Sequence, residues 1–428
     1  MLAGKLDSVP FPFIGGDVPE GHQGQSVEGM SHGTVLSKLK TGFHLRRIPW
    51  GFNADHQPIG GKFDHREDRL VAGCCLATSI TFDISPELLT GATGEPPADI
   101  AARVTARVAA LGLIVDAALL RSVWLTVRKM QVRDRKYAAI RAQLFTTGVG
   151  RDYFRELSID ELPGLTTPTT LATMLALCEA LGMAIHYVAP ALGFQKNIPF
   201  ADGVELERRI TAAWDVCKAF GVAIGFHSGS GKSEKNYRLC GRLTGSRPEI
   251  KTSGRYTYEM GRALAASPDA GDQALWQAWW AFTRDLSLDL AFGTNETARG
   301  LAPQFIAHSL GSKPFASRDA CAAALAAVQP DPEHMFWFEY NFLFVLAAGG
   351  RSATAALGDH GPAGYAQRAR FYAISPVGRL GYLRRVAEYL LFLAETTGQA
   401  PAVVCAAAKA RLAAYRAPED FLADIAPA

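Results

Sequence analysis

Three histidines occupy comparable positions in short apolar runs that are typical of β-strands. His56 and His227 each close such a run, and His186 lies within another. The carboxyl ends of the strands in a parallel barrel meet at one mouth, so three such imidazoles could converge there. Three imidazoles suit Zn²⁺ or a similar divalent metal with one position left for a substrate. A single histidine is more often a hydrogen-bonded structural residue, so the metal site is predicted from the set of three.

Three carboxylates near these runs are candidates for proton transfer, which requires an acid or a base positioned at the reacting group. Asp55 precedes His56, and both can reach the mouth if the chain turns at the end of the strand. Asp83 ends the next strand-like run and is predicted to contact the substrate, with proton transfer as a reserve role and a helix cap or turn as the alternative. Glu156 lies among arginines, a setting that is also typical of a surface ion pair.

A loop rich in glycine and serine and two later basic residues are candidates for holding a substrate. The segment 227–233 follows a predicted strand but lacks the first glycine of a phosphate-binding P-loop. We expect its backbone N–H groups, Ser228 and Lys232 to contact the substrate, with a plain turn as the alternative. Lys251 and Arg255 follow the next predicted strand, and the arginine could clamp a carboxylate with two hydrogen bonds. Ordinary exposed basic residues are the alternative.

The elements that would position these residues repeat one local pattern, in which a helix stops at a glycine and an apolar run follows. The pattern occurs at Gly112, Gly182 and Gly221. Glycine just after a helix adopts the left-handed conformation that ends it, and an apolar run without polar alternation is typical of a buried parallel strand. Strands are therefore predicted at 113–115 and after the other two glycines, with a short candidate at 249–251. The predicted fold is α/β, a single (β/α)8 TIM-barrel-like domain.

The remaining segments define the predicted organisation around the barrel. Residues 1–43 are rich in glycine, serine and proline and are predicted to form an N-terminal arm. The catalytic domain is predicted over 44–428, including helices from 379 to 415 at its carboxyl end. The tryptophans within 275–290 have helical spacing, whereas the apolar run 335–348 fits either a strand or a buried helix.

Composition excludes several classes of function. The chain has 428 residues, 44 basic and 41 acidic, for a net charge of +3, and this balance argues against a nucleic-acid-binding surface. Its seven cysteines are odd in number and form no CxxC pair, which favours reduced thiols in the cytoplasm. Neither a signal peptide nor an apolar stretch of about 20 residues is evident, so no membrane association is expected.

Three stretches taken together resemble the tagaturonate/fructuronate epimerases. They are 50–64, 80–88, and 224–232 with the Lys-Thr-Ser-Gly that begins at Lys251. The resemblance runs from about His44 to the C-terminus. It implies a metal-dependent epimerase, an isomerase of carbohydrate metabolism that interconverts two keto-uronates. Some relatives act on the ketohexoses tagatose and fructose.

The resemblance also implies roles for particular residues. In the family an aspartate beside a metal-binding histidine accepts a proton, which corresponds to Asp55 next to His56. A glutamate donates a proton, which corresponds to Glu156, and His186 and His227 complete the metal site. The N-terminal arm is shorter here than in some members, and Gly231 stands where the family often has an aspartate. The choice between a uronate and a neutral ketose therefore stays open.

The predicted reaction inverts a carbon β to the ketone, whose C–H bond is not acidified, so retro-aldol cleavage and re-addition is expected. The cofactor would be a divalent cation (Zn, Mn, Co or Ni), and the substrate a small keto-sugar or keto-uronate. A homo-oligomer is a further candidate assembly. A metal-dependent lyase, dehydratase or isomerase of sugar acids is the alternative enzyme. An NAD-dependent epimerase would need a dinucleotide fingerprint, which the sequence lacks. A sugar- or nucleotide-binding module without turnover is a further alternative.

Overall fold

The computed structural model describes residues 34–39, 42, 45, 51, 53–160, 164–252, 254–294, 296–341, 344 and 368–425. The predicted N-terminal arm at 1–43 lies almost wholly outside these residues. The described chain divides into two compact units. The sheet unit runs up to Lys251 and includes Thr396–Gln399, and the helical unit comprises Thr252–Glu395 and the chain from Ala400 onward. The segment 44–428, predicted as one catalytic domain, therefore contains two compact units.

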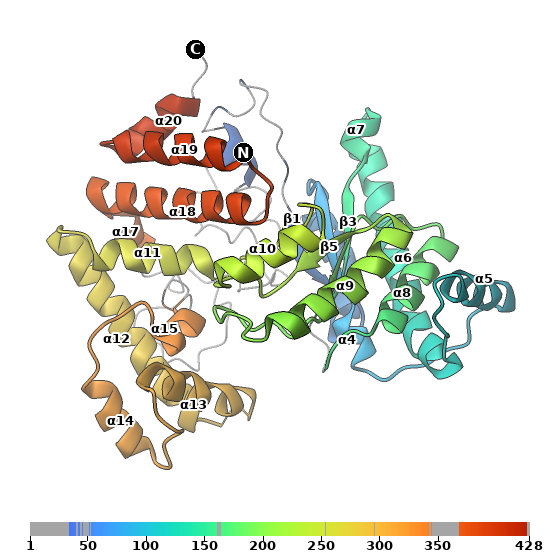
Figure 1. Cartoon of the computed structure of the whole chain (residues 1–428), viewed down its shortest axis with the longest axis horizontal. Helices are drawn as coiled ribbons and strands as arrows, with labels where there is room; N and C mark the ends of the chain where they lie inside the picture. Colours follow the sequence, from blue (N-terminus) through green and yellow to red (C-terminus); the bar gives the residue numbers. More distant parts are fainter. Residues whose placement is uncertain are drawn as a thin grey trace. The chain divides into compact units, whose positions relative to one another are not determined.

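The sheet unit is built on six parallel strands that pair side by side in the order of the sequence. Figure 1 labels three of these strands, β1, β3 and β5. The strands are β1 (Asn53–Pro58), β2 (Ser79–Asp83), β3 (Phe154–Ile159), β4 (Tyr187–Pro190), β5 (Ala223–Phe226) and β6 (Glu249–Ile250). Sequential parallel order requires a crossover between every pair of strands, and here the crossovers are helical. This is the strand order of a (β/α) barrel, and the α/β class is as predicted.

The crossovers differ in length. The connection from β1 to β2 contains η2 (Gly61–Arg66) and α3 (Glu67–Gly73). The connection from β2 to β3 is the longest, with α4 (Ser85–Leu88), α5 (Ala98–Ala109), α6 (Ala117–Leu144) and α7 (Gly148–Arg151). The next three connections each contain one helix, in turn α8 (Pro168–Ala180), α9 (Gly203–Phe220) and α10 (Glu234–Leu243). Apolar residues on the outer face of the strands are fully buried against these helices, among them Leu157, Ile159, Val188 and Ile224. The face of the sheet that packs against these helices, called the outer face, therefore forms the core. The opposite face, called the inner face, carries the polar residues.

The prediction of eight strands is not confirmed, because the described residues form a parallel half-barrel of six. One predicted strand, at 113–115, is wrong. Gly112 has a φ of +71° and follows the end of α5 as predicted, but the apolar residues after it connect α5 to α6. The side chain of Asp116, four residues after Gly112, accepts a hydrogen bond from the Ala118 N–H and caps α6, which begins at Ala117. A helix cap so close behind leaves no room for a strand.

The other two helix-ending glycines behave as predicted. Gly182 and Gly221 have φ values of +70° and +66°, and β4 and β5 follow them. At Gly221 the backbone N–H bonds to the last turn of α9. The predicted short strand at 249–251 is β6.

The helical unit has its own aromatic core. Its helices are α11 (Arg255–Ala265), α12 (Ala270–Phe292), α13 (Glu296–Leu310), α14 (Arg318–Ala326), α15 (Met335–Tyr340), α17 (Arg368–Tyr372), α18 (Pro376–Thr396), α19 (Ala402–Ala414) and α20 (Pro418–Ile425). Trp276 and Trp279 of α12 pack edge-on against Trp337 of α15. The run 275–290 is therefore helical, and so is the described beginning of the run 335–348. The helices predicted at the carboxyl end are α18 and α19. None of the helices within the described ranges is long and apolar enough to cross a membrane.

Candidate active site

Strand β3 supplies the inner face of the sheet with a row of polar residues. Side chains alternate between the two faces of a strand, so Glu156, Ser158 and Asp160 share one face while Leu157 and Ile159 face the helices. The Ser158 hydroxyl donates to Asp160 at 2.7 Å, which agrees with this alternation. Asp160 is the first residue after β3, at the carboxyl edge of the sheet.

His227 lies at the centre of the site. It directly follows β5, and its ring nitrogens bond to two carboxylates, Nε2 to Glu156 of β3 at 2.8 Å and Nδ1 to Asp160 just after β3 at 3.0 Å. Burial opposes a charge on the imidazole, but the two hydrogen bonds outweigh it and raise the pKa of His227 to about 9. The His56 ring from β1 lies 5.2 Å from the His227 ring, centroid to centroid. The structure thus brings together two of the three predicted histidines and Glu156.

Asp83, the last residue of β2, joins the cluster through His56. Its Oδ2 lies 3.6 Å from His56 Nδ1, and both side chains are buried. Its Oδ1 accepts from the Ser85 N–H at 3.0 Å, so it also makes the turn into α4 that the sequence offered as the alternative. Burial opposes the charge of the Asp83 carboxylate, but the contact with His56 outweighs it and lowers the pKa.

Glu156 shares the inner face with a second glutamate, Glu249 of β6. Burial and the neighbouring carboxylate of Glu156 raise the pKa of Glu249 well above its ordinary value. For Glu156 burial acts in the same direction, but His227 outweighs it and lowers the pKa. The Thr81 hydroxyl donates to Glu156 Oε2 at 2.5 Å. The two environments therefore keep one glutamate charged and the other protonated near neutral pH.

Gly225 of β5 provides the room for this pair. A Cβ at this position would lie 2.6 Å from Glu249 Oε2 and 3.0 Å from Glu156 Oε1. Real Cβ atoms essentially never approach other heavy atoms to 2.6 Å, so a larger residue would displace a glutamate. The two carboxyl groups can meet here only because the residue between them lacks a side chain.

Two overlapping groups of side chains could hold a metal ion. One ligand atom each from His56, Asp160 and His227 lie within 4.8 Å of one another, and the same holds for Glu156, His227 and Glu249. Two imidazoles and a carboxylate are a common donor set for a divalent transition metal. In the structure both nitrogens of His227 bond to carboxylates, so a cation would replace one of these contacts.

His186 is not brought to either group. It immediately precedes β4, at the amino end of that strand, whereas the prediction placed it near a carboxyl end. Its Nδ1 accepts a hydrogen bond from the Arg155 N–H at 3.1 Å, and its ring packs edge-on against Phe154. Burial, followed by the charge of Arg155, lowers its pKa. The prediction did not place His186 correctly, because the apolar run 183–188 begins before the strand itself, which starts at Tyr187.

The predicted substrate loop is placed at the carboxyl edge of the sheet, but Lys232 has another role there. Its Nζ donates to the carbonyls of Gln195, Ile198 and Ser230, and the side chain is buried. Its ammonium therefore joins the loop after β4 to the loop after β5, and its contact with a substrate stays a prediction. Ser228 follows His227 directly and is half-buried, with a φ of +52°.

The remaining predicted residues have mixed outcomes. Asp55 lies in β1, and its side chain is outside the described residues. The Lys251 N–H bonds to the Phe226 carbonyl at 3.2 Å and continues the pairing of β6 with β5. Arg255 bonds to Glu259 one turn along α11 at 2.7 Å. Its guanidinium also lies against the rings of Tyr258 and Tyr389, so it is engaged within the helical unit rather than presented as a clamp.

Asp160 and Glu249 were missed as candidates from the sequence. Asp160 could have been found from alternation, because it lies four residues after Glu156 and would share its face. Glu249 gave a weaker signal, since β6 has only two residues.

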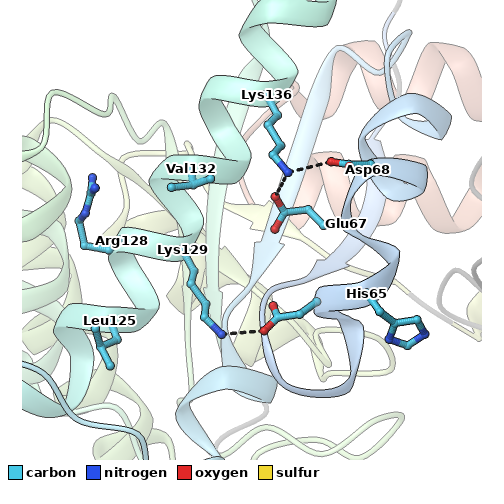
Figure 2. A pocket seen from close by; sticks show the side chains of 9 residues that line it. His65, Glu67, Asp68, Leu125, Arg128, Lys129, Val132 and Lys136 are labelled. Carbon is cyan, nitrogen blue, oxygen red and sulfur yellow. Dashed lines mark hydrogen bonds and ion pairs between the residues drawn. The ribbon is translucent and has the colours of Figure 1, made fainter.

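A hollow of about 430 Å³ lies away from this cluster, between η2–α3 and α6 (Figure 2). Its charged groups pair with each other: Lys129 Nζ with Asp64 at 2.8 Å, and Lys136 Nζ with Glu67 at 2.6 Å and Asp68 at 2.7 Å. None of the predicted site residues lines it, and its ion pairs join the first crossover to α6.

Comparison with known proteins gives a match at the level of fold. No protein-family model and no curated protein sequence matches the chain. The native crystal structure of fructuronate-tagaturonate epimerase UxaE from Cohnella laeviribosi aligns with a TM-score of 0.50 and 19% identity. The chain shares the fold of this epimerase.

The alignment to UxaE is broad. It covers 82% of this chain and 69% of the epimerase chain. A complex of UxaE with one glycerol aligns over the same shares at 18% identity and a TM-score of 0.50. The resemblance predicted from the sequence motifs therefore has a counterpart in the backbone.

Proposed function

We propose that the protein is an epimerase of keto-uronates, interconverting fructuronate and tagaturonate. Tagatose and fructose are further candidate substrates. The observation that carries the proposal is the buried cluster of two histidines and several carboxylates at the carboxyl edge of the parallel sheet, where barrel enzymes hold their active sites. A fold shared with a fructuronate-tagaturonate epimerase supports the choice of reaction.

The donor set favours a divalent metal as cofactor. His56, Asp160 and His227 would hold it, since their ligand atoms are mutually within 4.8 Å and two imidazoles with one carboxylate suit such an ion. When bound, the metal supplies a positive charge that stabilises the negative oxygens of an enediolate. Zn, Mn, Co and Ni are all compatible with these ligands. His186 is left out of the proposed ligand set.

The proposed reaction is a retro-aldol cleavage followed by aldol addition. A carboxylate removes the proton of the hydroxyl on the carbon β to the ketone. The electrons of that O–H bond form the aldehyde C=O, and the bond between the α and β carbons breaks to leave an enediolate. After the aldehyde rotates, the enediolate re-adds to its other face, and an acid returns the proton to the new alkoxide. Atoms and charge balance without an oxidant.

Two carboxyl groups are proposed for the proton transfers. Glu156 lies on the inner face, 2.8 Å from His227, and can hold or release a proton beside the metal ligands. Asp55 adjoins His56 in β1 and is the proposed acceptor for the opposite hydroxyl orientation. Asp83 lies beside His56 and is the next candidate if either assignment fails.

The test is product analysis by carbon NMR. Fructuronate, tagaturonate, fructose and tagatose are each incubated with purified protein supplied with Zn²⁺, Mn²⁺, Co²⁺ or Ni²⁺ in turn. We expect one keto-uronate to convert to the other, and Asp160→Asn to abolish the conversion. Glu179→Gln, which removes an exposed carboxylate of α8, is the control and should leave the rate unchanged. No conversion of any of the four with any metal would refute the proposal.

A further inference from the structure

A cavity of about 760 Å³ opens at the amino edge of the parallel sheet, the edge opposite the candidate active site. The first residue of every strand lines it, among them Asn53 of β1, Phe154 of β3 and Tyr187 of β4. Ligand pockets of small molecules fall in the range of about 300–1,000 Å³. The cavity is therefore large enough for a monosaccharide.

One wall of the cavity is aromatic and exposed. Phe154 and Tyr187 lie edge to face with ring centroids 6.1 Å apart, and the Phe154 side chain is 52% exposed. Half-exposed aromatic rings beside polar groups are suited to partly apolar ligands such as a sugar ring.

The rim carries a cation and two amides. Arg247, exposed at the surface, lies at the rim just before β6, and no ion pair is recorded for it among the described residues. Gln399 reaches the rim from the short return segment Thr396–Gln399, where its Nε2 donates to the Pro248 carbonyl at 2.8 Å. Asn53 is the other amide. A guanidinium is the group best suited to bind a carboxylate with two hydrogen bonds.

Glu156 and Glu249 line the interior of the cavity. The Oε2 atom of Glu249 is buried, and its carboxyl group adjoins that of Glu156, with which it shares a hydrogen bond when it is protonated. Carboxyl oxygens have several lone pairs, so a hydroxyl group of a ligand could donate a further hydrogen bond to this pair. Carboxyl groups would repel a ligand carboxylate, so a ligand with hydroxyls at one end and a carboxylate at the other would place its carboxylate at the rim.

We infer that this cavity binds a small hydroxylated carboxylic acid, with its carboxylate at Arg247 and its hydroxyls toward Glu156 and Glu249. None of the proposed metal ligands His56, Asp160 and His227 lines the cavity, whereas Glu156 and Glu249 of the second possible metal group do. Glu156 belongs to both the cavity and the candidate active site, since it lines the cavity and bonds to His227. An acid bound at the amino edge would therefore contact Glu156 on the side opposite His227.

The experiment is calorimetric titration with D-galacturonate and D-galactose, which differ only in carrying a carboxylate or a hydroxymethyl group. We expect wild-type protein to bind galacturonate about tenfold or more tightly than galactose, the effect of a charge-assisted contact. Arg247→Gln should remove this preference by weakening only the acid. Arg242→Gln is the matched control, an exposed arginine of α10 that pairs with Glu207 outside the cavity, and it should bind like wild type.

Phe154→Leu gives a second readout, because loss of the aromatic wall should weaken both sugars alike. A galacturonate preference that survives in Arg247→Gln would overturn the inference, as would wild-type protein that binds neither sugar at millimolar concentration. Neither probe is a ketose, so these titrations do not depend on turnover. If no epimerisation is found but Arg247→Gln loses the preference for galacturonate, the cavity site is supported although the proposed function is not.

Discussion

At the scale of single residues, the site depends on His227 and the carboxylates on either side of it. Glu156 and Asp160 bond to opposite nitrogens of one imidazole, so removing any of the three leaves a buried polar group without its partner. The roles proposed for these residues differ, however, and substitutions should separate metal binding from proton transfer.

The first prediction separates these roles. Glu156→Gln keeps the size of the side chain and removes proton transfer, so kcat should fall by roughly 10²- to 10⁴-fold with metal content near normal. His227→Ala should lose bound metal together with activity. Steady-state kinetics and metal analysis of both variants are the measurements. A fully active Glu156→Gln would make Glu156 a structural residue, and Asp83 would be tested next.

Asp55→Asn is a second prediction of the same kind. If Asp55 is the proton acceptor, the variant should lose kcat by roughly 10²- to 10⁴-fold and keep its metal. The measurement is again kinetics paired with metal analysis. Loss of metal in this variant would instead assign Asp55 to the ligands and leave the acceptor to be found.

A third prediction concerns Glu249 and the pH dependence of stability. Its pKa is raised from 4.5 to about 8 in the folded protein. Because the pKa is higher in the folded state than in the unfolded state, protonated Glu249 makes its full contribution to stability below about pH 4.5. This contribution is lost as the pH rises toward 8. In metal-free protein, Glu249→Gln should therefore gain unfolding free energy relative to wild type between about pH 5 and pH 8.

Urea unfolding at several pH values measures this difference. Glu179→Gln, which removes an exposed carboxylate of α8, is the control and should show a difference from wild type that does not change with pH. A Glu249→Gln difference that is equally flat would mean that Glu249 is ionised in the folded protein.

At the scale of elements, local sequence signals predicted the strands that follow glycine-capped helices and missed the exact strand ends. Gly182 and Gly221 precede β4 and β5, but β4 starts at Tyr187, one residue after His186. His186 therefore lies at the amino edge of the sheet, beside Arg155, and away from His227 at the carboxyl edge. Strand ends are fixed by pairing with neighbours, here Glu156 with Tyr187, and pairing partners are not visible in one sequence.

The fourth prediction tests the tight packing inside β5. Gly225→Ala places a methyl group 2.6 Å from Glu249 Oε2, so the variant should be destabilised by about 1–3 kcal/mol, as is usual when a packed site is overfilled. Gly203→Ala is the control, because nothing lies within 4 Å of a Cβ there. Thermal unfolding of the two variants measures the difference, and equal melting temperatures would contradict the packing described here.

At the scale of the whole molecule, the α/β class and the parallel sheet followed from the repeated helix–glycine–strand pattern, whereas the number of strands did not. Six parallel strands are formed by the described residues, and the rest of the described chain is a helical unit with an aromatic core. A buried apolar run fits a helix or a strand equally well in sequence, as 335–348 illustrates, so long-range packing decides between them.

The central claim is that the protein inverts a carbon β to a ketone by breaking and remaking a carbon–carbon bond. The most direct measurement is epimerisation in deuterium oxide, with the product analysed by proton and carbon NMR. Retro-aldol chemistry never breaks the C–H bond at the inverting carbon, so that carbon should keep its original hydrogen in the product. Deuterium at the inverted carbon would contradict the account, because it would show inversion by removal and return of that hydrogen.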